Sequence, residues 1–237
     1  MRWSTLAAAV VAAWLLVCIP ANSEEPAEFK AGGSFAGGKS TDGMVLSGIR
    51  FGRHTGYTRM VLDFEFAGGG QTAQHPVYEV AYLEFPYRLS IRLQGVTFSS
   101  DSVVQAKPAL PFSVVTELNG TVREMQIYLS GPSEFKVIEI DNPAKLSIDV
   151  RRLEQAVPDI FTVQLLAPQN AQEAYALLEQ GNLPTGYNPS VLVLGEVVVV
   201  EQVFTDPSAA VAMESALKEL GHSAVINQRR GDQLPSM

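Results

Sequence analysis

The chain contains a single cysteine, Cys18, inside an apolar run near its start. The run extends from Leu6 to Ile19, follows Arg2 and precedes the small residues Ala21-Asn22-Ser23. This pattern predicts a signal peptide over residues 1–23, cleaved after its last residue. Two alternatives remain open: lipid attachment at the cysteine, and retention of the run as an uncleaved anchor. After cleavage no cysteine remains, which excludes disulfides, thiolate catalysis and cysteine metal sites.

Positive charge is also scarce. The sequence has 17 Lys and Arg against 25 Asp and Glu, a formal net charge of −8. Loss of Arg2 with the signal peptide leaves 16 against 25, or −9. Because no cluster of Lys and Arg is visible either, the composition argues against nucleic acid and anionic membrane surfaces as partners.

Motifs for catalysis are missing as well. The three histidines, His54, His75 and His222, form no HExxH motif and do not lie near a carboxylate at metal-ligand spacing. There is no G-x-S-x-G, no P-loop and no dinucleotide fingerprint. We therefore expect a protein that is not an enzyme and that uses no cofactor and no metal.

One segment of the sequence occurs twice. Tyr78 to Leu93 aligns without a gap with Phe135 to Val150, at a constant offset of 57 residues (135 − 78). The shared residues include a central proline, Pro86 in the first copy and Pro143 in the second, and residues along one alternating face. Such a pattern predicts a duplicated strand–turn–strand unit.

Residues 44–153 are therefore expected to be all-β. Arg59 to Phe66 and Glu124 to Ser130 alternate between apolar and polar residues, and each precedes one copy of the repeat, so we predict two three-stranded units. Asn119-Gly120 predicts a hairpin turn. Burial of the two apolar faces against each other would give a small β-sandwich. The glycine-rich stretch before them, residues 24–43, is expected to be a linker.

Residues 158–230 show a different pattern, with the element order β-α-β-β-α-β. Asn170 and Asp206 are the expected N-caps of the two helices, and Pro207 follows the second cap. The order predicts a small α+β, ferredoxin-like domain. Both helices would cover one face of its sheet and leave the other face for a ligand or partner. The expected strands are Phe161 to Leu166, Val191 to Leu194, Val197 to Phe204 and Ser223 to Asn227.

Two stretches resemble domain families of the bacterial envelope. Val45 to Val150 resembles the AMIN domain through Gly48 to His54, Thr58 to Asp63 and both proline-containing repeats. This resemblance implies a symmetric β-sandwich that localises its carrier to peptidoglycan. Phe161 to Gln228 is similar to the SPOR domain through Phe161-Thr162-Val163-Gln164, the first helix, a glycine before a strand and a phenylalanine before the second helix. That similarity implies binding of glycan strands without stem peptides on the exposed sheet face.

Seven residues are candidates for glycan contacts. Arg53-His54 precedes a turn and could bond sugar hydroxyls from a strand end, whereas Gln164 would point to the uncovered sheet face. A loop tyrosine could stack on a sugar ring, and one glutamate stands where SPOR domains usually carry an arginine. Each has a plainer alternative as a hairpin rim, an outward-facing strand residue or a packing residue. The candidates are Arg53, His54, Arg59, Arg88, Gln164, Tyr187 and Glu201.

Together these patterns predict a non-enzymatic, exported protein of the periplasm or cell envelope. Two recognition modules would bind peptidoglycan glycan strands, each weakly, and their linkage would prolong the contact. The alternative is a protein–protein scaffold or an accessory subunit of a secretion, pilus or cell-division complex, because the sheet residues Val198 and Val200 would suit a protein partner. An enzyme with an unrecognised carboxylate site is a more distant third hypothesis.

Overall fold

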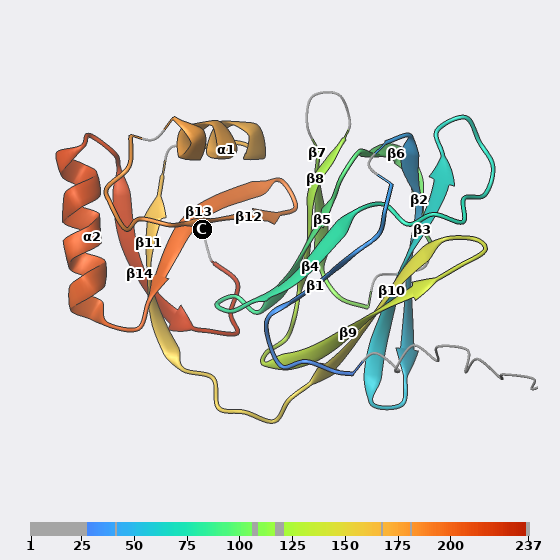
Figure 1. The fold of residues 1–237 in the computed structure, drawn as a ribbon. Coiled ribbons are helices and arrows are strands. Elements are labelled where there is room, and N and C mark those ends of the chain that lie inside the picture. Colours follow the sequence, from blue (N-terminus) through green and yellow to red (C-terminus); the bar gives the residue numbers. More distant parts are fainter. Residues whose placement is uncertain are drawn as a thin grey trace, which may run out of the picture.

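The structure is a computed structural model, and it describes residues 28–40, 42–105, 109–116, 121–166, 168–180 and 182–235. The predicted signal peptide, with Cys18, and the predicted turn at Asn119-Gly120 lie outside the described residues. The described part is mostly β-structure, with three sheets and two helices (Figure 1). Neither of these two described helices is long and apolar enough to cross a membrane.

Two five-stranded sheets form the N-terminal unit, which we define as residues 28–153. Sheet A has the order β6 (Val96–Gln105), β2 (Met44–His54), β3 (Tyr57–Phe66), β10 (Lys145–Arg152) and β9 (Ser133–Ile140). Sheet B has the order β1 (Ser34–Gly37), β4 (Tyr78–Leu83), β5 (Arg88–Leu93), β8 (Val122–Tyr128) and β7 (Phe112–Thr116).

Alternating apolar residues of both sheets meet in one core. Leu62 and Phe64 of β3 and Ile148 of β10 share this core with Leu89 of β5 and Met125 of β8, and all five are at most 1% exposed. The residues between them along each strand are polar and point outward, as the period of two requires. This hydrophobic contact joins sheet A to sheet B.

The duplicated segment folds as two hairpins, β4–β5 and β9–β10. The expected three-stranded units are wrong, however. Strand β3 precedes the first hairpin but pairs with β10 of the second, whereas β8 pairs with β5 of the first. Each repeat thus divides its strands between the two sheets. Alternation shows which face of a strand is buried, but it does not show which strand lies beside it.

Part of the expected linker is also structured. Strand β1 pairs with β4 at the edge of sheet B, and Lys30 exchanges two backbone hydrogen bonds with Phe135 of β9. The ring of Phe35 packs edge-on against Phe135, with ring centroids 5.2 Å apart. The glycine content predicted a flexible tether, but the edge of a sheet offers unpaired backbone groups with which such a segment can pair.

The C-terminal unit, residues 159–235, has one four-stranded antiparallel sheet, sheet C. Its order is β12 (Ser190–Leu194), β13 (Val197–Phe204), β11 (Asp159–Leu165) and β14 (Ala224–Arg230). Helix α1 (Ala171–Glu179) follows β11 in the chain, and helix α2 (Pro207–Glu219) follows β13. This is the order of elements that the sequence predicts.

Both predicted helix caps are confirmed. Asn170 Oδ1 accepts a hydrogen bond from the backbone N–H of Glu173 at 2.9 Å, and Asp206 Oδ1 accepts one from Ser208 at 3.0 Å. Each bond satisfies a backbone N–H that has no partner within its helix. Ala174 of α1 and Leu217 of α2 belong to the same core, so both helices cover one face of sheet C.

Leu146→Ala tests whether the shared core carries the stability of the N-terminal unit. Leu146 is fully buried in β10, so the variant should lose about 2–5 kcal/mol of unfolding free energy through lost burial and the cavity left behind. Urea unfolding followed by circular dichroism measures the loss. The same change at Leu166, which is 55% exposed, should cost about 0.5 kcal/mol or less. Equal losses in the two variants would contradict this role for the core.

Candidate functional site

The helix-free face of sheet C is partly covered by sheet B. Tyr128 of β8 forms an apolar cluster with Leu192 of β12 and Val199 of β13, and all three are at most 3% exposed. Leu194 and Val197 pack against the same cluster. In Figure 1, β8 runs beside the β12–β13 hairpin. The face that was predicted to bind a ligand is therefore covered, on its β12–β13 side, by residues of the same chain.

Side chains of β8 also satisfy the free edge of β12. Gln126 Nε2 donates to the carbonyl oxygen of Val191 at 2.6 Å, and Tyr128 Oη lies 3.0 Å from the carbonyl oxygen of Val193. The N–H of Val193 donates to Gln126 Oε1 at 3.2 Å and to Tyr128 Oη at 3.1 Å. Backbone groups at a sheet edge otherwise stay open to water or to another strand. These bonds close that edge and orient the two units.

Charged groups are buried at the same junction. The guanidinium of Arg88 donates to Ser190 Oγ at 2.7 Å and to the carbonyl oxygen of Pro86 at 3.1 Å, while its Nε has no hydrogen-bond partner among the described residues. Burial lowers the pKa of Arg88, and nearby Tyr128 and Glu124 partly offset this effect. Arg88 forms no ion pair within 4.0 Å with any described carboxylate, and a buried cation without a direct partner is costly. The buried polar groups make this contact more polar than the core between sheets A and B.

Glu124 links the junction to helix α1. Its carboxylate accepts hydrogen bonds from Ser90 Oγ at 2.5 Å, Tyr175 Oη at 2.6 Å and Gln126 Nε2 at 3.2 Å. Burial, followed by the charge of Glu124, raises the pKa of Tyr175. Arg123 lies over the ring of Tyr175, 3.9 Å from its centroid. These contacts hold one side chain of α1 against β8.

Three predicted glycan contacts are buried and cannot meet a ligand in this arrangement. Arg88 is 3% exposed in the junction, and Glu201 is 2% exposed, with its carboxylate bound to Arg229 at 2.5 and 3.0 Å. Tyr187 is 8% exposed in the core beneath the helices, where its hydroxyl donates to the carbonyl oxygen of Val163 at 3.3 Å. The sequence shows that these residues can form hydrogen bonds, but it does not show which distant strands and helices bury them.

Gln164 keeps a partly open position on the remaining helix-free face. It is half-buried in β11, and its Oε1 accepts a hydrogen bond from Asn227 Nδ2 of β14 at 3.1 Å. The β11–β14 side of this face therefore presents two side-chain amides. Gln164 lies on a different unit from Arg53, His54 and Arg59, so the seven candidates do not form one site.

Arg53, His54 and Arg59 lie on the β2–β3 hairpin of sheet A, with His54 and Arg59 on the outer face and Arg53, which alternates with His54, on the opposite face. His54 and Tyr57 face each other across the turn and stack, with ring centroids 4.7 Å apart and planes 8° from parallel. The guanidinium carbon of Arg59 lies 5.5 Å from the centroid of the Tyr57 ring. Arg53 and His54 are exposed. The hairpin end is therefore a surface of flat, hydrogen-bonding side chains.

The outer face of sheet A continues as a row of ion pairs. Arg59 donates two hydrogen bonds to the fully buried Asp149, at 2.5 and 2.7 Å, and Lys136 lies 3.5 Å from the same carboxylate. Further along β3, Asp63 accepts two hydrogen bonds from the guanidinium of Arg50, at 2.6 and 2.8 Å. The bonds to these carboxylates raise the pKa of Arg50 and Arg59. Paired bonds of this kind hold the side chains in fixed orientations.

A groove of about 320 Å³ lies beside the Arg50–Asp63 pair. Its floor includes Gly48 of β2, where a side chain would meet Asp63 at 3.3 Å, and its walls include Gln71 and Lys145. Asp63 was not among the predicted site residues, although it lies on the same face of β3 as the candidate Arg59. The polar residues that alternate with the apolar ones along β3 could have predicted this polar face.

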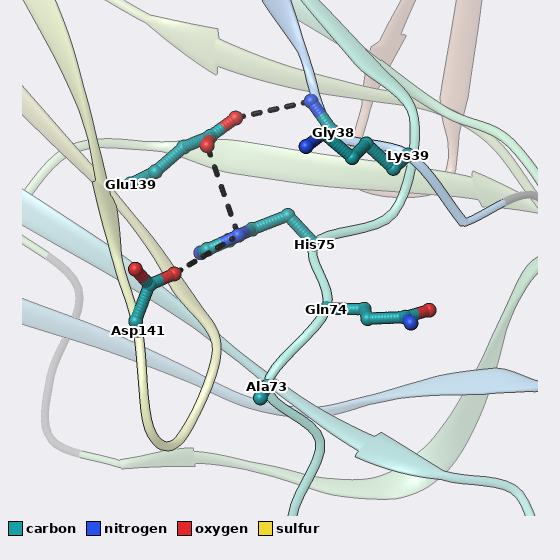
Figure 2. A pocket seen from close by; sticks show the side chains of 7 residues that line it. All are labelled: Gly38, Lys39, Ala73, Gln74, His75, Glu139 and Asp141. Carbon is teal, nitrogen blue, oxygen red and sulfur yellow. Dashed lines mark hydrogen bonds and ion pairs between the residues drawn. The ribbon is translucent and has the colours of Figure 1, made fainter.

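A second hollow, of about 410 Å³, lies between β1, the segment before β4 and the β9–β10 turn (Figure 2). His75 forms its inner wall and is 6% exposed. Figure 2 shows Glu139 and Asp141 on either side of its ring. Within the described residues, no group of three or more His, Cys, Asp or Glu is arranged to hold a metal ion.

Comparisons with family models, with curated proteins and with solved structures gave no match. The resemblances to AMIN and SPOR domains therefore stay predictions.

The edge contacts of β12 can be tested by removing both polar side chains that close it. In Gln126→Leu combined with Tyr128→Phe, the Val193 N–H loses both of its partners, so its hydrogen exchange should accelerate by about tenfold or more, given roughly 1–3 kcal/mol for an unsatisfied buried group. Gln228→Leu, at an exposed position of β14, should leave this amide unchanged. Unchanged exchange in the double variant would show that the units are held by other contacts.

Tyr128 should also make stability depend on alkaline pH. Burial raises its pKa to about 12, from about 10 in an unfolded chain. Between these values the folded phenol keeps a proton that the unfolded phenol loses, so the stabilisation is complete below about pH 10 and falls by up to about 1.4 kcal/mol per pH unit towards pH 12. Urea unfolding across this range should give a shallower slope for Tyr128→Phe than for the unaltered protein. Identical slopes would contradict the assignment.

Proposed function

We propose that the protein is a non-enzymatic, exported binding protein of the bacterial cell envelope, and that it recognises peptidoglycan through the outer face of sheet A. The observation that carries this proposal is the surface around His54, Tyr57 and Arg59 on this face, at the hairpin end that also carries Arg53. It combines exposed hydrogen-bonding side chains with a stacked aromatic pair and a neighbouring polar groove.

Such a surface suits a sugar chain for physical reasons. A hexose presents hydroxyls around its rim, and these can donate to carboxylates and accept from guanidinium groups. The ion pairs at Asp63 and Asp149 hold their arginines in place before a ligand arrives, which reduces the side-chain entropy lost on binding. The net negative charge of the chain favours a neutral glycan over an anionic wall polymer.

We propose the finer fold on the same basis. Sheets A and B, which share one core, would be a β-sandwich of the AMIN type. The C-terminal unit, with the strand order β12-β13-β11-β14 and both helices on one face, would be a ferredoxin-like domain of the SPOR type. Its glycan contacts would be limited to the β11–β14 side, around Gln164 and Asn227, because β8 covers the other side.

A protein–protein scaffold is the second candidate function. One observation favours it: the helix-free face of sheet C already holds a protein surface, with Gln126 and Tyr128 bound to the edge of β12. A sheet edge that binds side chains of its own chain could also bind a strand from a component of a secretion, pilus or cell-division complex. In this case the outer face of sheet A would carry no glycan.

Co-sedimentation with purified peptidoglycan sacculi tests the proposal. The unaltered protein should sediment with sacculi that have been freed of wall-bound proteins. Arg53→Ala combined with His54→Ala should weaken this binding by about tenfold, because each lost polar or stacking contact is worth roughly 0.5–1.5 kcal/mol.

The matched control removes the same two residue types from the other unit. His222→Ala combined with Arg230→Ala should bind sacculi like the unaltered protein, since both side chains belong to the C-terminal unit and contact Asn182 and Asp232 of that unit. No sedimentation of the unaltered protein, or equal losses in the two double variants, would overturn the proposal and favour the scaffold.

A further inference from the structure

Strand β14 is an open edge of sheet C. It pairs with β11 on one side, has no other strand partner among the described residues, and lies at the opposite edge of the sheet from β12 (Figure 1). Two other edges are closed within the chain. Gln126 and Tyr128 bind the edge of β12, and Lys30 binds part of the edge of β9 through Phe135. Because unpaired backbone groups at an edge can pair with another strand, β14 is a candidate interface.

Both ends of the open part can be located from hydrogen bonds. At the start, the carbonyl oxygen of Ser223 accepts from the N–H of Leu166, so Ser223 faces β11. At the end, Arg230 faces away from β11, but Gln233 binds both its N–H and its carbonyl oxygen. Neighbouring residues of a strand alternate in the direction of their backbone groups. The residues between these ends whose backbone groups face outward and remain open are Ala224, Ile226 and Gln228.

This window, residues 224–228, lacks the features that usually protect an edge strand. It reads Ala-Val-Ile-Asn-Gln, without a charged residue, proline or glycine, and its pairing with β11 contains no bulge. Asn227 and Gln228 are exposed. Charged side chains, proline and bulges are the usual means of keeping edge strands apart, so the window is free to pair with a further strand.

We propose that two copies of the chain associate by antiparallel pairing of their β14 strands, about a two-fold axis at Ile226. In this register Ile226 lies opposite the partner's Ile226, and Ala224 lies opposite the partner's Gln228. Because Ile226 is the midpoint of the window, every open N–H and carbonyl group of the window finds a partner in the other copy. The two copies of sheet C then form one continuous sheet with the same surface on both sides of the contact.

The charges of β14 favour this register. The strand ends with Arg229 and Arg230, which would lie opposite the partner's Ser223 and the partner's His222. The arginines of the two copies are then about 20 Å apart along the ladder, farther than the Debye length of about 8 Å in physiological salt. A shift towards the C-terminus would bring them together, and it would also need the backbone groups of Arg230 that Gln233 already binds.

The same geometry limits the assembly to two copies. Each copy uses its β14 edge once, and the other edge of sheet C is closed by Gln126 and Tyr128 of β8. A contact between identical surfaces about a two-fold axis is closed, whereas a contact between two different edges would continue into a filament. A dimer is therefore the expected end state.

Analytical ultracentrifugation of the unaltered protein should show a dimer at about 100 μM that dissociates on dilution. Gln228→Pro removes an N–H that faces out of sheet C, so the pairing with β11 is kept, but each copy loses a donor to its partner. The dissociation constant should rise by about tenfold or more. Gln228→Ala is the matched control, because it removes the same side chain and keeps the N–H. Its dissociation constant should stay within about twofold of that of the unaltered protein.

A cysteine experiment tests the register without relying on proline. In a Cys18→Ser background, which has no other cysteine, Val225→Cys and Asn227→Cys are prepared as separate proteins. Residue 225 would lie opposite residue 227 of the partner, with Cα atoms about 4.5 Å apart, which permits a disulfide. Identical residues of the two copies would be about 8 Å apart, which does not. A mixture of the two proteins should therefore cross-link under a mild oxidant, and neither protein should do so alone.

A monomer at about 100 μM would overturn the proposal and leave the edge free for a strand of another protein. Equal dissociation constants for Gln228→Pro and Gln228→Ala would do the same. Cross-linking of either single variant as fast as the mixture would contradict the register. Sacculus binding is measured separately and is proposed for sheet A, so the two proposals can fail independently.

Discussion

The whole arrangement depends on the exchange of strands between the two repeats. Strand β3 of the first repeat pairs with β10 of the second, and β8 of the second pairs with β5 of the first. Neither repeat can therefore bury its apolar face alone, and the single core shared by sheets A and B forms only when both are present. The outer faces of both sheets lie outside this core: that of sheet A carries the Arg–Asp ion pairs, and that of sheet B packs against the C-terminal unit.

The two outer faces then differ in what covers them. In sheet B, Ser90, Gln126 and Tyr128 point toward the C-terminal unit and satisfy the edge of β12 or the carboxylate of Glu124. In sheet A, the corresponding face pairs its charges within itself, at Asp63 and Asp149, and no described residue of the C-terminal unit covers it. The open face is the one at which we propose that a ligand binds, and the covered face joins the units.

The predicted site residues show that a polar residue in the sequence can be either exposed or buried, depending on which distant elements cover it. Arg53 and His54 lie at an exposed hairpin end, where the sequence placed them, because a turn must lie at the surface. Arg88 and Glu201 are equally polar in sequence but are buried, since the strands and the unit that cover them are distant in the chain. In the sequence, no metal or catalytic motif surrounds His75. Its carboxylate neighbours lie more than sixty residues away in the β9–β10 hairpin.

Short-range chemistry by itself determined the two repeat hairpins, the helix caps at Asn170 and Asp206, and the order of elements after residue 158. These features depend on side-chain alternation and on hydrogen bonds between residues a few positions apart. Only the tertiary structure decided that the repeats exchange strands, that residues 34–37 join sheet B, and that β8 covers part of sheet C. Strand pairing and docking depend on which distant surfaces match in shape and hydrogen bonding, and a period of two in the sequence carries no information about that choice.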